Sequence, residues 1–399
     1  MINQLSQSII NHNKIVNVCI LGSTGSIGIN TLDVISRHAD KYYAFAISAW
    51  NNIELLYQQI LQFKPQYAVV SSSEQAKILN DKLKINNIKT HVLHGIQGLC
   101  EISKHELTDV VMAAIVGSAG LQPTLEAVKS GKKILLANKE SLVAAGQIFT
   151  DAAIYYNAEV LPVDSEHNAI YQCYAKNGIG VKGIILTASG GPFLNLDINK
   201  FDNITPEMAC NHPKWKMGRK ISIDSATMLN KGLELIEAYW LFPEVNNNIK
   251  IVVHPQSIVH SFVEYIDGSV LAQLSHPDMR IPIAYALGYP ARIDSGAKNL
   301  DISQISSLNF YEPDLNKFPC IKLAYQALEQ QQCITLNAAN EIAVESFLNG
   351  KIKFVQIHQV IENILNRYTY QKPNNLEEVL GVDKYVRTLT CDYINSFML

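Results

Sequence analysis

The chain has 399 residues, 48% of them hydrophobic, which at ~150 residues per domain is enough for two or three domains with substantial cores. A net charge of −3 and the absence of basic runs interleaved with aromatic residues argue against a nucleic-acid-binding protein. No apolar stretch approaches the ~20 residues that a membrane-spanning helix requires, so no membrane association is expected.

The amino-terminal segment, residues 1–14, is polar and rich in Asn, Gln and Ser, which predicts a short disordered extension without a secretory signal. The seven cysteines form no CxxC pair, and their odd number favours a reducing cytoplasm over a disulfide framework. His91 and His94 form an HxxH pair, a spacing that lies more often on a surface than around a metal.

Residues 15–164 alternate between short apolar runs and helical patterns, which predicts a Rossmann-like α/β domain with a parallel sheet covered by helices on both faces. Val110–Val116 is apolar throughout, as expected for a strand that is buried on both faces. The expected strands are Ile15–Leu21, Tyr42–Ala49, Tyr67–Ser72, Asp109–Val116, Lys133–Ala137 and Glu159–Val163.

The pattern changes in residues 165–290, where a strand is expected at Ile251–Val253. Asp267-Gly268 joins two alternating runs, Val259–Tyr265 and Val270–Leu274, and is a strong hairpin signal. We therefore expect a central α+β domain with a mixed or antiparallel sheet. Residues 291–319 lose periodicity and are interpreted as a linker, and residues 320–399 predict a C-terminal helical bundle of about four segments.

A glycine-rich segment, Gly22-Ser23-Thr24-Gly25-Ser26-Ile27-Gly28, follows the first strand and opens a helix. Its backbone N–H groups would approach a pyrophosphate at the helix N-terminus, which predicts nucleotide binding. The second strand ends in Trp50-Asn51-Asn52, which offers neither the acidic residue typical of NAD sites nor the basic residue typical of NADP sites. The absence of an acid favours NADP.

An acidic segment, Asp164-Ser165-Glu166, follows the sixth expected strand at the same sheet edge as the glycine segment and Asn138-Lys139-Glu140-Ser141. In an extended backbone, Asp164 and Glu166 would point to one side. Two carboxylates without a His or Cys at ligand spacing suit Mg²⁺ or Mn²⁺. The alternative is a solvated strand end that caps the next helix.

A third carboxylate, Glu234, lies in a helical pattern that Asp224 or Ser225 would cap, with Asn230 and Lys231 on the same face. An ordinary surface Lys–Glu pair is the alternative. The helix also carries an apolar stripe of Leu229, Leu233, Ile236 and Trp240. Because this stripe indicates a packed helix, the polar residues along its edge would line a crevice.

Two further segments suit an anionic ligand. Thr187–Pro192 predicts a strand end that runs into a flexible turn with free N–H groups and the Ser189 hydroxyl. Residues 211–220 form a basic loop around Trp215 that would fold over a small phosphorylated substrate as a lid. The alternative is a plain surface loop, in which Trp215 would be an unusual choice.

Seven motifs in order resemble the 1-deoxy-D-xylulose 5-phosphate reductoisomerase family: GSTGSIG, ANKESLV, PVDSEHNAI, TASGGPF, HPKWKMGRKISIDSATMLNKGLELIEA, VVHPQSIVHS and LNAANEIAV. The resemblance covers nearly the whole chain beyond the amino-terminal extension. It implies rearrangement of 1-deoxy-D-xylulose 5-phosphate and reduction by NADPH to 2-C-methyl-D-erythritol 4-phosphate in non-mevalonate isoprenoid synthesis. It also implies a homodimer with an NADPH domain (15–164), a catalytic and dimerisation domain (165–290) and a C-terminal helical domain.

The resemblance also assigns site residues. The implied metal ligands are Asp164, Glu166 and Glu234, which with Lys139 form the expected catalytic set. The implied substrate contacts are Lys139, Ser165, Glu166, Ser189, His212, Ser225, Asn230, Lys231 and Glu234, with Ser189, Ser225, Asn230 and Lys231 nearest the phosphate. The implied cofactor contacts are Thr24, Gly25, Ser26, Ile27, Asn52, Asn138, Glu140 and Gly218.

One departure concerns the cofactor. The family usually has Gly-Lys-Asn where this chain has Trp50-Asn51-Asn52, so the lysine is missing and a weaker preference for NADPH over NADH is expected.

Two competing hypotheses make different demands on the sequence. A metal-free NADP-linked aldehyde dehydrogenase needs a nucleophilic cysteine with a nearby base, and Cys173 and Cys210 are the candidates in the central region. A non-catalytic nucleotide-sensing module would have no reason to keep Asp164, Glu166 and Glu234 together.

Overall fold

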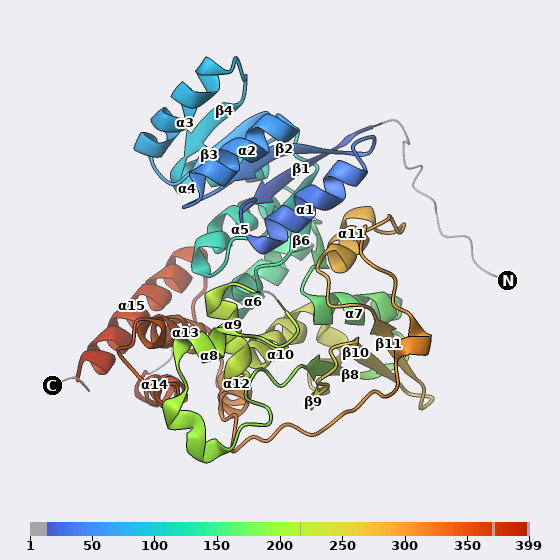
Figure 1. Cartoon of the computed structure of the whole chain (residues 1–399), viewed down its shortest axis with the longest axis vertical. Coiled ribbons are helices and arrows are strands. Elements are labelled where there is room, and N and C mark those ends of the chain that lie inside the picture. The colour runs from blue at the N-terminus through green and yellow to red at the C-terminus, as the bar shows by residue number, and fades with distance from the viewer. Residues whose placement is uncertain (1–13, 216, 369–371, 397–399) are drawn as a thin grey trace.

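The computed structural model describes residues 14–215, 217–368 and 372–396, so all but the last residue of the predicted extension lies outside the described residues. The described chain contains two β-sheets and a C-terminal group of helices (Figure 1). No helix within those ranges combines the length and the apolarity needed to cross a bilayer.

The first sheet has seven strands, all parallel, in the order β4-β3-β2-β1-β5-β6-β7. They span Val16–Leu21 (β1), Tyr42–Ser48 (β2), Tyr67–Val70 (β3), His91–His94 (β4), Val110–Ala113 (β5), Lys133–Leu136 (β6) and Glu159–Pro162 (β7). The chain reverses its direction of growth between β1 and β5, the point at which parallel sheets of this kind bind ligands. The parallel-sheet prediction is therefore confirmed.

Strand β4 was not predicted from the sequence. Its sequence is only HVLH, with exposed histidines at both ends and no apolar run, because it pairs on one side only, with β3 at the sheet edge. His91 and His94 thus lie on the surface, as their spacing suggested.

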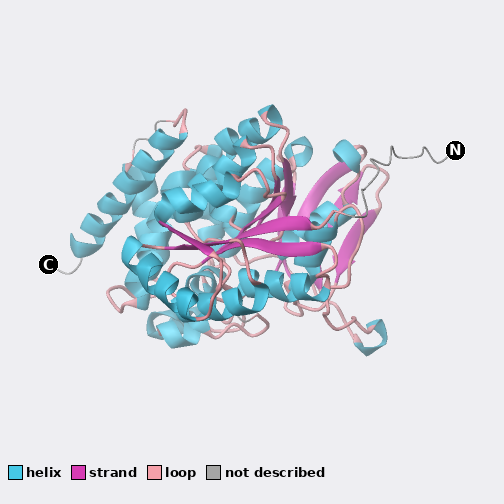
Figure 2. Cartoon of the chain, turned by 90° about the horizontal axis from the view of Figure 1, so that it is seen from above, coloured by secondary structure: helices cyan, strands magenta, loops and turns pink. Residues whose placement is uncertain are grey.

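The two faces of this sheet follow from the alternation of side chains along each strand. In β1, Val18 and Ile20 enter one core, whereas Cys19 and Leu21 enter the other. The first core is covered by α1 (Ser26–Arg37), α2 (Ile53–Phe63), α3 (Ser73–Ile85) and α11 (Arg280–Gly288). The second is covered by α4 (Gly95–Lys104), α5 (Leu121–Lys129) and α6 (Lys139–Tyr155), so helices flank both faces (Figure 2).

The second sheet is mixed, with the order β11-β10-β8-β9. Its strands are β8 (Val181–Ala188), β9 (Ile249–Val253), β10 (Val259–Tyr265) and β11 (Val270–Leu274). The predicted Asp267-Gly268 hairpin is confirmed, because β10 and β11 pair antiparallel around it. The helices of this part of the chain are α7 (Ser165–Cys173), α8 (Pro206–Cys210), α9 (Arg219–Ala226) and α10 (Leu229–Leu241).

One predicted helix is wrong: the segment from Asp224 to Glu234 is two helices. Helix α9 ends at Ala226, Met228 has a left-handed φ of 59°, and α10 begins at Leu229. The Thr227 hydroxyl accepts a hydrogen bond from the Leu229 N–H at 3.3 Å, a side-chain contact that competes with helix continuation. Asp224 therefore lies inside α9, buried, and caps no helix.

Past α11, residues 289–319 contain one short 3₁₀ turn, η5 (Ile302–Gln304), and a single bridge from Val253 to Tyr311. Beyond them, the described residues form α12 (Cys320–Glu329), α13 (Cys333–Leu348), α14 (Gln356–Arg367) and α15 (Leu376–Ser396). The prediction of a helical C-terminal region is confirmed. Other 3₁₀ turns occur at Ser118–Gly120 (η1), Lys176–Gly178 (η2), Ile198–Asn203 (η3) and Pro243–Val245 (η4).

Candidate active site

A cavity of about 180 Å³ lies where the carboxyl edge of the first sheet faces the second sheet. Its walls include residues directly after β6 and β7 and at the end of β8, such as Ala137, Asp164 and Ala188. The predicted site residues that line it are Ser26, Ile27, Lys139, Asp164, Ser165, Glu166, Ser189, His212, Trp215, Gly218, Ser225, Asn230, Lys231 and Glu234. Segments more than 200 residues apart thus meet at one opening.

The glycine segment forms the turn from β1 into α1. Gly22 has a φ of +89°, and a Cβ there would lie 3.0 Å from the Ala114 carbonyl oxygen. A Cβ on Gly28 would lie 2.4 Å from the Gly22 carbonyl oxygen, so glycine permits the close approach of helix and turn. Gly25 precedes α1 without a side-chain capping bond, which leaves first-turn N–H groups available to an anion.

Asp164 and Glu166 occupy the start of a helix rather than an extended strand end. Strand β7 ends at Pro162, and the Asp164 carboxylate caps α7 by accepting from the Glu166 N–H at 3.4 Å. The extended backbone considered for these two residues is therefore not adopted, and the helix cap named as the alternative is observed, because the capping bond starts the helix at Ser165. The helical geometry nevertheless directs both carboxylates into the cavity.

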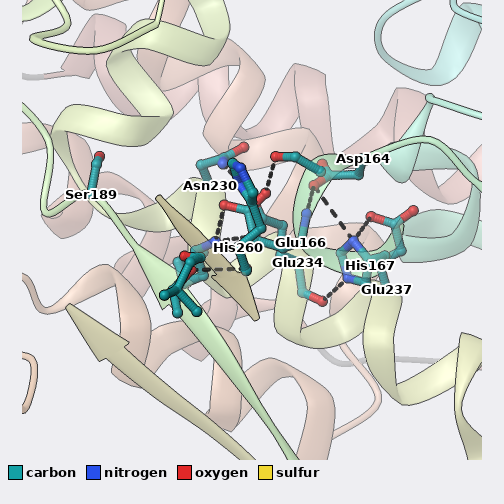
Figure 3. A network of polar contacts seen from close by, with 12 residues as sticks. Asp164, Glu166, His167, Ser189, Asn230, Glu234, Glu237 and His260 are labelled. Atoms are coloured by element: carbon teal, nitrogen blue, oxygen red, sulfur yellow. Dashed lines mark hydrogen bonds and ion pairs between the residues drawn. The ribbon is translucent and has the colours of Figure 1, made fainter. Parts of the chain in front are cut away.

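The three predicted carboxylates converge. Oxygens of Asp164, Glu166 and Glu234 all lie within 4.8 Å of one another, although Glu234 comes from α10 (Figure 3). The Glu234 side chain is 1% exposed, so the cluster is held at the bottom of the cavity rather than on a solvated face. An all-oxygen donor set of this kind suits a hard divalent cation.

Two ammonium groups lie among these carboxylates. Lys139 Nζ is 2.7 Å from Asp164 Oδ2 and 3.2 Å from Glu234 Oε1. Lys231 Nζ is 2.8 Å from Glu166 Oε1 and also contacts Glu234, which further accepts from the Asn230 amide. The face shared by Asn230, Lys231 and Glu234 is thus confirmed.

The ionisation of the cluster follows from these contacts. Burial alone would lower the pKa of Lys139, but the Asp164 and Glu234 carboxylates raise it well above its ordinary value. Burial would raise the pKa of Asp164, yet the Lys139 ammonium holds it well below its usual range. Burial, together with Glu166, raises the pKa of Glu234. The site therefore favours positive charge beside its carboxylates.

His212 connects the turn after β8 to the Trp215 loop. Its Nδ1 accepts the Trp215 backbone N–H at 2.9 Å, so in the neutral ring the proton is on Nε2. Nε2 is 2.9 Å from Ser189 Oγ and donates to it. Burial lowers the pKa of His212, which favours this neutral form. The residues of the two predicted anion-binding segments therefore touch.

Among the cavity residues that were not assigned from the sequence are His254, Ser257 and His260. The Trp215 and His260 rings meet edge to face with centroids 6.2 Å apart. The motif VVHPQSIVHS carried the signal, since it contains all three, but nothing in its local spacing indicated that β9 and β10 would bring it to the cavity. His167, Glu237 and Lys220 were also missed.

Five predicted cofactor contacts are not among the cavity-lining residues: Thr24, Gly25, Asn52, Asn138 and Glu140. The Asn52 and Asn138 side chains cap α2 and α6 through the N–H groups of Leu55 and Ser141, at 3.1 and 3.0 Å. The Glu140 carboxylate is buried and forms an ion pair with Lys220 at 2.9 Å.

The cysteines required by the aldehyde dehydrogenase hypothesis lie elsewhere. Neither Cys173, at the end of α7, nor Cys210, at the end of α8, is among the residues that line the cavity. Burial raises the pKa of Cys173, whereas a nucleophilic thiol needs a lowered one. Nothing in this geometry favours that chemistry.

Comparisons with known proteins agree along the chain. Residues 18–146 match the family model of 1-deoxy-D-xylulose 5-phosphate reductoisomerase, and residues 160–242 and 274–389 match two models of its C-terminal domain. The enzyme of that name from Nitrosomonas eutropha is 53% identical over 388 residues, covering 95% of this chain and 94% of the relative. The enzyme from Pseudomonas syringae pv. tomato is 50% identical over 386 residues, covering 95% and 98%.

Solved structures agree as well. A DOX-P reductoisomerase in complex with NADPH, fosmidomycin and magnesium superposes with a TM-score of 0.93 at 45% identity, covering 96% of this chain and 99% of that one. The Zymomonas mobilis enzyme in complex with NADPH gives a TM-score of 0.90 at 42% identity, covering 96% and 100%. The chain therefore belongs to the 1-deoxy-D-xylulose 5-phosphate reductoisomerase family.

Proposed function

We propose that this chain rearranges 1-deoxy-D-xylulose 5-phosphate and reduces the product with NADPH to 2-C-methyl-D-erythritol 4-phosphate, in non-mevalonate isoprenoid synthesis. The observation that carries the proposal is the convergence of Asp164, Glu166 and Glu234 within 4.8 Å in a cavity that also receives the start of α1. Membership of the family supplies the substrate and the cofactor. A nucleotide sensor would have no use for the three carboxylates.

Asp164, Glu166 and Glu234 are the proposed ligands of Mg²⁺ or Mn²⁺, to which their oxygens are suited. A bound divalent cation supplies Lewis-acid stabilisation of the negative charge that develops on substrate oxygens. Lys139 and Lys231 hold the carboxylates together through the ion pairs described above. Lys139 is also proposed to contact substrate, because it is one of the residues that line the cavity.

The substrate phosphate is proposed to bind in the cavity through Ser189, Ser225, Asn230 and Lys231, of which Asn230 and Lys231 also contact the carboxylates. His212 positions Ser189 by donating to its hydroxyl. Fixing the phosphate away from the reacting carbons orients the substrate and contributes binding energy to the reaction. The remaining proposed substrate contacts are Ser165, Glu166 and Glu234.

The cofactor is proposed to lie along the turn between β1 and α1, with Thr24, Gly25, Ser26 and Ile27 at its phosphates and Gly218 across the cavity. NADPH supplies the hydride for the reductive step. Asn52, Asn138 and Glu140 are proposed to act on the cofactor through the loops and helix ends that they hold. Trp215 is proposed to cover the cavity and exclude water.

The same proposal divides the chain into a cofactor domain (15–164), a catalytic and dimerisation domain (165–290), a linker (291–319) and a helical domain (320–399). It includes a homodimer, for which β11 is the candidate contact because an open strand edge invites pairing. Val270 and Leu271 on that strand are about half exposed. A cytoplasmic location is proposed because none of the seven cysteines, all within the described residues, forms a disulfide.

Metal removal tests the function directly. With deoxyxylulose phosphate and NADPH as substrates, loss of nicotinamide absorbance should stop in EDTA and resume when Mg²⁺ or Mn²⁺ is added. NADPH binding, followed by its fluorescence, should persist in the chelator. Unchanged turnover in EDTA would contradict the proposal and favour metal-free dehydrogenase chemistry.

A further inference from the structure

Behind the acidic cluster, the same two helices make a second contact. His167 lies one turn after Asp164 on α7, and Glu237 lies one turn after Glu234 on α10. The side chains of His167 and Glu237 are both 0% exposed, with Nδ1 and Oε2 3.2 Å apart (Figure 3). We call these two residues the His167–Glu237 pair.

The imidazole of His167 contacts both proposed ligand segments. Its Nε2 is 2.8 Å from the Glu234 carbonyl oxygen, which only accepts, so Nε2 donates and the ring orientation is fixed. The other ring nitrogen, Nδ1, then faces Glu237 and lies 3.6 Å from Asp164 Oδ1. One ring therefore spans the backbone of Glu234 and the side chain of Asp164.

The Glu237 carboxyl has the His167 ring as its polar neighbour. Neither carboxylate oxygen of Glu237 forms a hydrogen bond with a described residue. Within the described chain, His167 is the only side chain able to carry a positive charge that lies within 4.0 Å of these oxygens. A buried carboxylate is costly unless it is compensated, and packing alone needs no charge at this position. The polar contact available to the Glu237 carboxyl in the described chain is therefore the His167 ring.

We propose that Glu237, acting through His167, is a positioning residue that keeps Asp164 and Glu234 at the spacing that a divalent cation requires. The inference rests on the proposed metal site. Groups that orient metal ligands typically change metal affinity by about 10- to 100-fold when they are removed. Glu237 itself touches neither the cavity nor the substrate, since it is absent from the residues that line the cavity.

An alternative arrangement uses the same atoms. Ligand atoms of Asp164, His167 and Glu237 also lie within 4.8 Å of one another, as a second cation would require. We favour the direct His167–Glu237 contact because 3.2 Å is the separation of an ion pair that needs no bridging ion. The stoichiometry of metal binding distinguishes the two arrangements.

The test measures Mn²⁺ binding to the substrate-free protein by electron paramagnetic resonance of free Mn²⁺. Glu237→Gln should weaken Mn²⁺ binding by about 10- to 100-fold with one site per chain. The matched control is Asp383→Asn, which removes another buried carboxylate, paired with Arg387 at 2.7 Å on α15. The control should leave Mn²⁺ affinity unchanged, and NADPH fluorescence should show cofactor binding intact in both variants.

His167→Gln removes the same contact from its other side, and its Mn²⁺ affinity tests the inference even if Glu237→Gln fails to fold. Because the two residues act as a unit, the double variant should weaken Mn²⁺ binding no more than either single one. Unchanged Mn²⁺ affinity with a lowered melting temperature would reduce the pair to a structural contact. Two Mn²⁺ per wild-type chain would also overturn the inference, whereas a wild-type chain that binds none would refute the metal site itself.

Discussion

Two neighbouring residues of α6, Lys139 and Glu140, belong to two different clusters of charged side chains. Lys139 enters the cavity cluster, whose members are Lys139, Asp164, Glu166, Asn230, Lys231 and Glu234. Glu140 enters what we call the closed cluster, whose members are Glu140, Lys220, Asp224 and Asn340. Each cluster has one more carboxylate than it has ammonium groups, so net charge does not distinguish them.

Geometry does distinguish them. In the closed cluster, Lys220 Nζ lies 2.9 Å from both Glu140 and Asp224, Asn340 donates to Asp224 at 2.8 Å, and no member lines the cavity. In the cavity cluster, three carboxylates converge and face open space. The difference teaches that convergence and access, rather than buried charge as such, mark a ligand site.

The largest expected effect comes from breaking the cavity cluster. Glu234→Gln removes one charged ligand from the proposed metal site and should lower kcat by roughly 10²- to 10³-fold, the equivalent of about 3–4 kcal/mol of Lewis-acid stabilisation. Steady-state kinetics at saturating Mg²⁺ measure this loss. Because the Glu234 side chain contacts Lys139, Asn230 and Lys231, and no hydrogen bond or ion pair joins it to the glycine turn within the described residues, NADPH binding should be nearly unchanged.

The matched control for Glu234→Gln is Glu244→Gln, which changes an exposed carboxylate in η4, beyond the end of α10, with a partner in Tyr174. The control should keep full turnover. If Glu234→Gln lowered the melting temperature but kept its kcat, the cavity cluster would be structural, like the closed one, and the comparison would fail.

Breaking the closed cluster should affect stability instead. Lys220→Met leaves Glu140 and Asp224 buried without their cation, and removing one partner of a buried ion pair costs about 3 kcal/mol. Urea unfolding of the wild type and the variant at pH 7 measures the difference in their free energies of unfolding. Lys250→Met is the control, because the Lys250 side chain is 58% exposed and its ion pair with Glu264 should contribute less than about 1 kcal/mol.

The Lys220→Met effect should also depend on pH. Burial alone would raise the pKa of Glu140, but the Lys220 ammonium lowers it below its ordinary value. A lowered pKa in the folded state stabilises the protein above the ordinary pKa of about 4.3 and ceases to do so as the pH falls further. The difference between wild type and variant should thus be full at pH 7 and smaller near pH 4. If the difference in the free energy of unfolding were the same at both pH values, the loss of stability would come from altered packing and not from the ion pair.

Local patterns predicted the elements, but not how distant elements meet. The bounds of β10 and β11 match the prediction because Asp267-Gly268 between two strand-like runs is a local signal. Strand β4 was not predicted because the sequence HVLH has no strand pattern of its own and forms a strand by pairing with β3. The break between α9 and α10 at Met228 was not predicted, because it involves a hydrogen bond to the Thr227 hydroxyl and hydrophobic periodicity carries no information about such a bond.

The same limit applies to the site. The convergence of Asp164, Glu166 and Glu234 was predicted, since the motifs that contain them were recognised together. The local geometry at Asp164 was left open, because a short acidic segment after a strand is compatible with both an extended end and a helix cap, and the structure has the cap. Lys220 and Glu237 were missed because their roles come from partners 80 and 70 residues away along the chain.

The smallest expected effect comes from adding a charge outside both clusters. Asn51 is exposed between β2 and the start of α2, where the family usually has a lysine. Asn51→Lys should raise the ratio of kcat/KM for NADPH over NADH by roughly tenfold, the worth of one charge-assisted bond to the 2′-phosphate. Asn51→Gln, which adds length without charge, should leave the ratio unchanged. A wild-type ratio that already strongly favours NADPH, and that Asn51→Lys does not raise, would mean that the 2′-phosphate is recognised by other residues. Mg²⁺ dependence should be identical in all three proteins, because the added ammonium belongs to neither cluster.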